Sequence, residues 1–139
     1  MLAIDFGTKN IGLAVTDDSG SFSFAFDTLR TDPRKGLKKE RLKILADLQK
    51  ICLIQKIEKV VVGLPTNLEK GDPTQMTKVV FDFVRELEDC LKPSGVTVDT
   101  FDERWTTFQA SRMANKNSRN IDELSAQILL QDYIDKIDI

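Results

Sequence analysis

The chain opens on MLAIDFGTKNIGLAV, residues 1–15, and this stretch decides the fold class. Leu2 to Phe6 is typical of a β-strand, because Leu2, Ile4 and Phe6 alternate onto one face. Asp5 interrupts the apolar run, and the glycine-containing turn 7–10 follows at once. A second strand from Ile11 to Thr16 is apolar on both faces, as central strands are. A carboxylate in a central strand is costly unless it is paired or binds a metal, so Asp5 is a candidate functional residue.

Composition narrows the kinds of site that this chain could carry. The sequence has 139 residues, a net charge of −2 and no histidine, which excludes a histidine base, a Ser-His-Asp triad and histidine-ligated zinc. Cys52 and Cys90 match no metal motif and are predicted to be reduced core thiols. Any metal would therefore bind to oxygen, which favours Mg²⁺ or Mn²⁺. No run approaches the ~20 apolar residues of a membrane span and no signal peptide is recognised, so we expect a cytoplasmic protein.

The order of predicted elements is β-β-β-α-β-α-β-α-α. The turn 17–20 makes a hairpin, and SFSFAF (residues 21–26) gives a third strand with its phenylalanines on one face. Helices are predicted from Asp32-Pro33 and from Asp72-Pro73, then from Thr106 to Ala114 and from Ile121 to Ile134. Strands at 59–65 and 96–101 alternate with them. Three antiparallel strands followed by helix-connected strands predict an α/β, ribonuclease H-like fold: a mixed five-stranded sheet with helices on both faces, in a single domain spanning 1–139.

Three acids stand out by their position in these elements. Asp5 lies in the first strand, Glu103 just past the fifth strand, and Asp122 at the start of the last helix. Strand ends and helix starts at one edge of an α/β sheet are where sites gather. Three carboxylates there would form an oxygen cage for one or two divalent cations, which suits phosphodiester hydrolysis. The alternatives are structural: Asp122 as a helix cap, and Glu103 paired with Arg104.

Basic residues gather in two segments and in one turn. The first segment contains Arg30, Arg34, Lys35, Lys38, Lys39, Arg41 and Lys43, against the acids Asp32 and Glu40. The second contains Arg104, Arg112, Lys116 and Arg119 and no acid. Lys9 lies in the turn after Asp5, where it could meet a phosphate. Such surfaces can follow a phosphate backbone even on a mildly acidic protein, or they can be solvated faces and, for Lys9, an exposed turn.

Four blocks in order resemble one known family. IDFGTKNIGLAV (4–15), VVGLPTN (61–67), FDERWTTFQA (101–110) and IDELSAQILLQDYI (121–134) are similar to the YqgF family, also called RuvX. Its members are described as Holliday-junction resolvases and as nucleases that process the 5′ end of pre-16S ribosomal RNA. The resemblance implies a ribonuclease H-like fold and an Mg²⁺- or Mn²⁺-binding triad, which falls on Asp5, Glu103 and Asp122. It also implies substrate contacts from Lys9 and Arg104.

The sequence therefore predicts a metal-dependent nuclease acting on structured nucleic acid, as a monomer or weak homodimer. RNA and branched DNA remain open as substrates, because both present phosphodiesters to the same site; a junction resolvase would need a two-fold dimer. A non-catalytic nucleic-acid binding module is a second alternative. An actin-like ATPase is a third, since IDFGTKN (4–10) also resembles a phosphate loop, but one domain of this size supplies half a nucleotide cleft.

Overall fold

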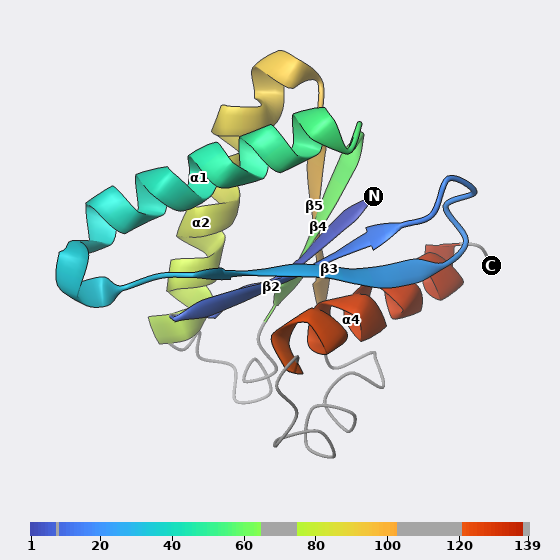
Figure 1. The fold of residues 1–139 in the computed structure, drawn as a ribbon, viewed down its shortest axis with the longest axis horizontal. Coiled ribbons are helices and arrows are strands. Elements are labelled where there is room, and N and C mark those ends of the chain that lie inside the picture. The colour runs from blue at the N-terminus through green and yellow to red at the C-terminus, as the bar shows by residue number, and fades with distance from the viewer. Residues whose placement is uncertain (8, 65–74, 103–120, 138–139) are drawn as a thin grey trace.

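The computed structural model describes residues 1–7, 9–64, 75–102 and 121–137, and Figure 1 shows their arrangement. The strands form one five-stranded sheet in the order β3-β2-β1-β4-β5. The elements are β1 (Leu2–Asp5), β2 (Asn10–Thr16), β3 (Ser23–Arg30), η1 (Pro33–Lys35), α1 (Leu37–Ile54), β4 (Lys59–Leu64), α2 (Gln75–Leu91), η3 (Lys92–Ser94), β5 (Thr97–Asp102) and α4 (Ile121–Ile137). The predicted helix at 106–114 lies outside the described residues.

The sheet is mixed, with β1 at its centre. β1 pairs antiparallel with β2 and parallel with β4, β2 pairs antiparallel with β3, and β4 pairs parallel with β5. The predicted antiparallel meander followed by helix-connected strands is confirmed. Turn chemistry at the first hairpin is also as predicted: the backbone N–H of Gly20 donates to the carbonyl of Asp17 at 3.0 Å.

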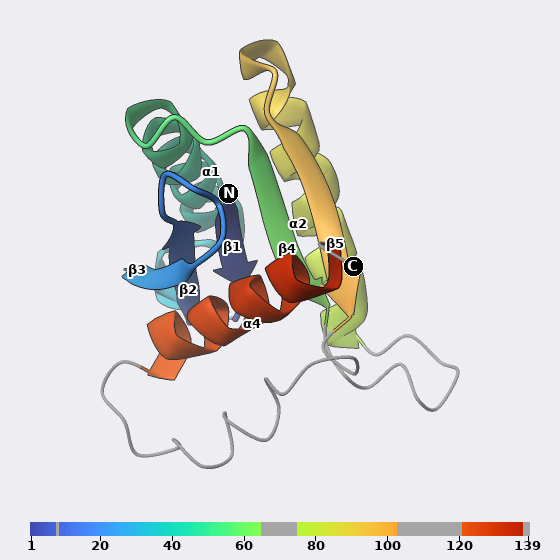
Figure 2. The same cartoon turned by 90° about the vertical axis from the view of Figure 1, so that its right-hand side faces the viewer.

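Helices cover both faces of this sheet, as predicted. α1 and α2 pack on one face through Ile44, Leu45, Leu48, Val80, Phe83 and Leu87, which meet Leu2, Ile4, Ile11 and Leu13 of the central strands. α4 crosses the other face, where Ala126, Leu129, Leu130 and Ile134 pack over Ala3 and Ala14 (Figure 2). Small side chains on β1 and β2 let α4 lie close to the sheet, whereas the other face carries larger ones. None of the described helices combines the length and apolarity that crossing a membrane requires.

Two sets of polar contacts hold α4 across the sheet. At the β3 side, Gln127 and Gln131 donate to the carbonyls of Ser23 and Ser21, both at 3.1 Å, and the Ser23 N–H donates to Oε1 of Gln131 at 3.0 Å. On the other side, Tyr133 donates to Asp99 on β5 at 2.8 Å and accepts a hydrogen bond from Lys59 on β4 at 3.0 Å. The bond to Tyr133 raises the pKa of Lys59 above its ordinary value. The position of α4 over β1 and β2 is therefore fixed from both sides.

Two local features differ from a plain reading of the sequence. The segment opened by Asp32-Pro33 forms only the short 3₁₀ turn η1, because Gly36 adopts a left-handed φ of 99° and α1 begins after it. Phe22, Phe24 and Phe26 are 62%, 53% and 36% exposed. Phe24 and Phe26 belong to the edge strand β3, which Phe22 precedes, and the pairing register of β3 shifts opposite Leu13 and Ala14. An alternating apolar pattern therefore does not mark a buried strand here.

Candidate active site

Asp5 is buried at the end of the central strand, with 5% of its surface exposed. Its neighbours Ile4 and Phe6 both pack on the α1–α2 face, where the Phe6 and Phe83 rings lie 4.7 Å apart. Since successive side chains of a strand alternate between faces, Asp5 lies on the opposite face, the one that α4 covers. The fold therefore holds the Asp5 carboxylate on the face of the sheet that α4 covers.

Gly12 brings the start of α4 to the same place. It is the residue directly opposite Asp5 in the antiparallel β1–β2 pair, so the two positions share a face. A Cβ built on Gly12 would overlap the carbonyl group of Asp122 and lie 3.1 Å from its Cα. The backbone of Asp122 therefore rests on Gly12, beside Asp5. The structure thus brings two of the three predicted carboxylate positions together.

This contact gives Gly12 a different role from the one its sequence position indicates. A glycine in the second strand predicts tight packing of that strand against the first, but the close approach here is between the strand and α4. Ala3, Gly12 and Ala14 form a patch of small residues on one face, and that pattern is the signal that a helix would approach closely. Gly7 is similar: an added Cβ would overlap the carbonyl oxygen of Asn10, so the turn itself requires glycine.

The helix end adds electrostatic support for negative charge. The first turn of α4 carries Asp122 and Glu123, and a helix N-terminus bears a partial positive charge that stabilises nearby carboxylates. Glu123 turns toward β3, where its Oε1 accepts a hydrogen bond from the Thr28 hydroxyl at 3.2 Å. Asp122 is half-buried, and its backbone packs against Gly12, the residue paired with Asp5.

The remaining predicted site residues are placed in part. Lys9 is exposed in the turn that follows Asp5, and its carbonyl accepts the Thr31 N–H at 2.8 Å. β5 ends at Asp102, which pairs with Leu64 of the α1–α2 core and so lies on the face away from Asp5. Glu103, Arg104, Arg112, Lys116 and Arg119 lie outside the described residues, and their roles stay predictions. Within the described ranges, no group of three or more acids or cysteines is close enough to hold a metal.

The donors at this place fit a hard divalent cation. Both described candidates, Asp5 and Asp122, are carboxylates, and the chain contains no histidine. The cysteines lie on α1 and α2, the helices on the far face of the sheet, and burial raises the pKa of Cys52 to about 11. Oxygen donors without nitrogen or thiolate suit Mg²⁺ or Mn²⁺ rather than zinc or copper.

Comparisons with known proteins agree with this architecture. Residues 1–136 match the model of the RuvX family, described as Holliday junction resolvase. The chain is 36% identical over 143 residues to a protein of Anaplasma marginale, covering 97% of this chain and 83% of that protein. It is 33% identical over 147 residues to one of Streptococcus mutans, covering 99% and 98%. Both relatives carry the name "Putative pre-16S rRNA nuclease".

Solved structures show the same fold at low identity. Thermus thermophilus RuvC in complex with a Holliday junction substrate superposes with a TM-score of 0.67 at 13% identity, covering 99% of this chain and 96% of that one. The fowlpox virus resolvase bound to Holliday junction DNA gives 0.59 at 11% identity, covering 99% of each chain. The fold is ribonuclease H-like, as the element order predicts. Together with the family match over 1–136, this makes the chain a member of the RuvX family of nucleases.

Proposed function

We propose that this chain is a metal-dependent endonuclease that hydrolyses phosphodiester bonds in structured nucleic acid, and that its substrate is the 5′ end of pre-16S ribosomal RNA. One observation carries the proposal: Asp5 is buried at the end of the central strand, directly opposite the glycine on which the Asp122 backbone rests. The names of its relatives support the choice of RNA.

In this proposal Asp5, Asp122 and Glu103 hold the catalytic cations. Bound between such carboxylates, divalent ions supply an activated water and neutralise the leaving oxygen. Asp5 contributes rigidity, because it stands on the central strand of the sheet and not on a loop. Lys9, exposed in the adjacent turn, holds a substrate phosphate, and Arg104, Arg112, Lys116 and Arg119 hold the substrate backbone.

The test is Asp5→Asn, which keeps the shape of the side chain and removes its charge. If Asp5 holds a cation, cleavage of a pre-16S RNA fragment in Mn²⁺ should fall by several orders of magnitude. Folding should survive, because one repelling carboxylate has left the cluster. Asp18→Asn is the matched control, since Asp18 is exposed in the hairpin turn after β2, at the end of the β1–β2 pair away from Asp5. It should leave the rate unchanged.

A purely structural Asp5 would give the reverse result. The variant would then lose a charge-assisted hydrogen bond, lowering the unfolding free energy by roughly 1–3 kcal/mol while the cleavage rate is kept. Retained cleavage with lowered stability would therefore overturn the catalytic role of Asp5. The same pair of measurements on Glu103→Gln distinguishes an enzyme from a non-catalytic binding module: an enzyme loses cleavage, whereas a binder holds nucleic acid as well as before.

Branched DNA is the second candidate substrate. It is favoured by the family description and by the two similar folds solved with Holliday junctions. Cleavage of the RNA fragment and of a four-way DNA junction should be compared side by side in Mg²⁺ and Mn²⁺. Because a junction is cut symmetrically by a two-fold dimer, the same samples should be sized in solution. Cleavage of RNA by a monomer supports RNA processing, and paired cuts by a dimer support junction resolution.

A further inference from the structure

A basic surface lies in the connection between β3 and α1 and in the first turn of α1. We name it the basic corner, and its members are Arg30, Arg34, Lys35, Lys38 and Lys39. All five are exposed. In the described part of the chain, Arg34 is the member with an ion pair, to Asp32 at 3.1 Å, and its side chain is still 91% exposed. The nearby Glu40 is buried and its Oε2 accepts the backbone N–H of Asp32 at 3.4 Å. Most of the positive charge of this corner is therefore uncompensated.

The fold does not need these charges where they stand. α1 begins at Leu37, so Lys38 and Lys39 occupy its first turn, where the helix dipole disfavours cations. Arg41 shows how a cation on this helix behaves when it serves the fold. It is 26% exposed, pairs with Glu86 at 3.3 Å, and stacks on the rings of Phe6 and Phe83. The members of the basic corner are all exposed, and none of them stacks on a ring of the described residues in this way.

The corner adjoins the turn that leaves the candidate active site. Arg30, the last residue of β3, pairs with Asn10 at the start of β2, and the next residue, Thr31, donates its N–H to the Lys9 carbonyl at 2.8 Å. Lys9 itself follows the strand that ends in Asp5. Exposed cations therefore follow one another from Lys9, beside the Asp5 end of β1, to Arg30 and the start of α1, with the acid Asp32 between Arg30 and Arg34.

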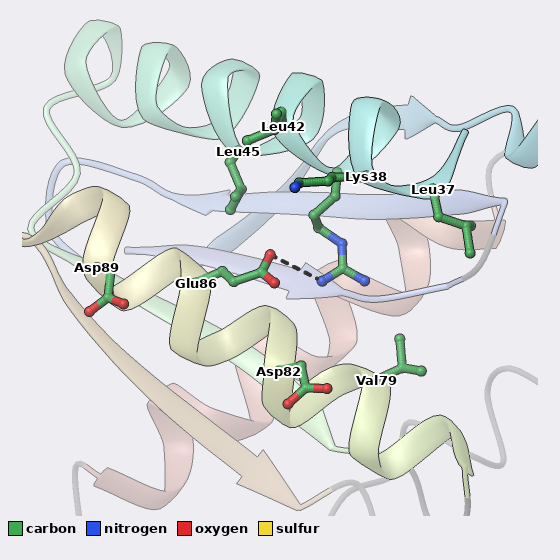
Figure 3. A pocket seen from close by; sticks show the side chains of 9 residues that line it. Leu37, Lys38, Leu42, Leu45, Val79, Asp82, Glu86 and Asp89 are labelled. Carbon is green, nitrogen blue, oxygen red and sulfur yellow. Dashed lines mark hydrogen bonds and ion pairs between the residues drawn. The ribbon is translucent and has the colours of Figure 1, made fainter. Parts of the chain in front are cut away.

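Negative charge borders the corner on its other side. A groove of about 630 Å³ separates α1 from α2, and Asp82, Glu86 and Asp89 line its α2 wall (Figure 3). Lys38 and Leu37 line the opposite wall. Glu86 is paired with Arg41, so Asp82 and Asp89 supply the negative charge that disfavours a polyanion in this groove and leaves the Lys9–Arg30 side for it.

We propose that the basic corner binds the sugar–phosphate backbone of the nucleic-acid substrate outside the cleavage site, with Lys9 joining the two. The inference rests on the proposed function, because it places this backbone relative to a nuclease site. Exposed, lysine-rich charge suits phosphates, which fix position without reading sequence. The corner thus holds the strand on the β3 side of the site, opposite in the sheet order to the β5 end that leads to Glu103.

The experiment measures binding without cleavage. A fluorescein-labelled single-stranded RNA of mixed sequence is titrated in EDTA, and affinity is followed by anisotropy at KCl concentrations between about 0.05 and 0.3 M. The corner variant is Lys35→Gln/Lys38→Gln/Lys39→Gln. The control variant removes the same charge at the other end of the sheet, where β4 begins: Lys50→Gln/Lys56→Gln/Lys92→Gln, all exposed positions. Melting temperatures are recorded for both.

The corner variant should reduce the slope of log affinity against log salt by about 2, since each lost single-strand contact removes roughly 0.7. If the variant and the wild type bind equally at ~1 M salt, this difference in slope makes the affinity of the variant about 100-fold weaker at ~0.1 M salt. Its melting temperature should equal or exceed that of the wild type, because cations leave a helix N-terminus. The control should keep the wild-type slope.

Equal slopes for the corner and control variants would overturn the inference, as would wild-type protein that does not bind this RNA. A corner variant that melts below the wild type would contradict the claim that the fold does not need these charges. Asp5→Asn separates the two proposals, since it should bind RNA with the wild-type slope while losing cleavage. If wild-type protein binds through the corner but cleaves neither RNA nor junction DNA in Mn²⁺, the proposed function fails and the binding surface stands.

Discussion

Replacing Gly12 by alanine adds a single methyl group at the point where α4 meets the sheet. The new Cβ would overlap the carbonyl carbon and oxygen of Asp122, and it would lie 3.1 Å from Asp122 Cα. These are backbone atoms, so no side-chain rotation relieves the clash. The first turn of α4 has to move away from β2 by roughly 1 Å, while Gln131 and Tyr133 hold the rest of the helix in place.

Two consequences follow with different magnitudes. Overpacking of this kind lowers the unfolding free energy by about 1–3 kcal/mol. With Asp122 in its proposed role as a cation ligand, a displacement of about 1 Å lowers the cleavage rate by roughly 100-fold. Stability is measured by urea unfolding and activity by Mn²⁺-dependent cleavage of the RNA fragment, both on Gly12→Ala.

Ala14→Gly serves as the control for stability alone. It removes a methyl group under α4 two residues further along β2, at a cost of about 1–2 kcal/mol, without pushing Asp122. Its cleavage rate should stay near that of the wild type. If Gly12→Ala keeps both the wild-type stability and the wild-type rate, Gly12 is not the contact that positions the start of α4, and the reasoning fails.

Two further predictions concern titrating groups away from the site. Burial raises the pKa of Cys52 to about 11, so at pH 8 its thiolate fraction is about 10⁻³. Ellman's reagent should therefore modify Cys52 far more slowly in the folded chain than in urea. Equal rates in the two states would contradict its burial. Hydrogen bonds from the Ser19 hydroxyl and from the backbone of Phe22, Ser21 and Gly20 hold the pKa of Asp17 below its ordinary value of 3.8. Asp17→Asn should therefore be less stable than wild type near neutral pH, and this difference in unfolding free energy should disappear as pH falls through the lowered pKa; a difference that persists in acid would show that charge is not its source.

Much of the fold follows from local pattern in the sequence. The meander of β1, β2 and β3 and the buried stripes of α1 and α2 come from alternation and helical spacing, which neighbouring residues determine. Phe24 and Phe26 show the limit of that reasoning, because their exposure depends on β3 being an edge strand, and strand order is a non-local property.

The site is predictable from the sequence only in part, for the same reason. Asp5 can be singled out because a carboxylate in an apolar strand is costly wherever the strand lies. Its proximity to Asp122 cannot be derived from spacing, since it depends on the path of α4 across β1 and β2. That path is set by Gly12 and by hydrogen bonds that join residues more than a hundred positions apart, such as Ser23 and Gln131.

The glutamine contacts between α4 and β3 also bear on solubility. An edge strand with free backbone groups and exposed phenylalanines is a template for pairing with other chains, and natural proteins cover such edges. Here the side-chain amides of Gln127 and Gln131 donate hydrogen bonds to the carbonyls of Ser23 and Ser21. Any local opening that releases α4 therefore separates Asp122 from the Asp5–Gly12 pair and exposes an aggregation-prone edge in the same event. Mutations that loosen this helix should be recovered as insoluble protein before they are recognised as inactive enzyme.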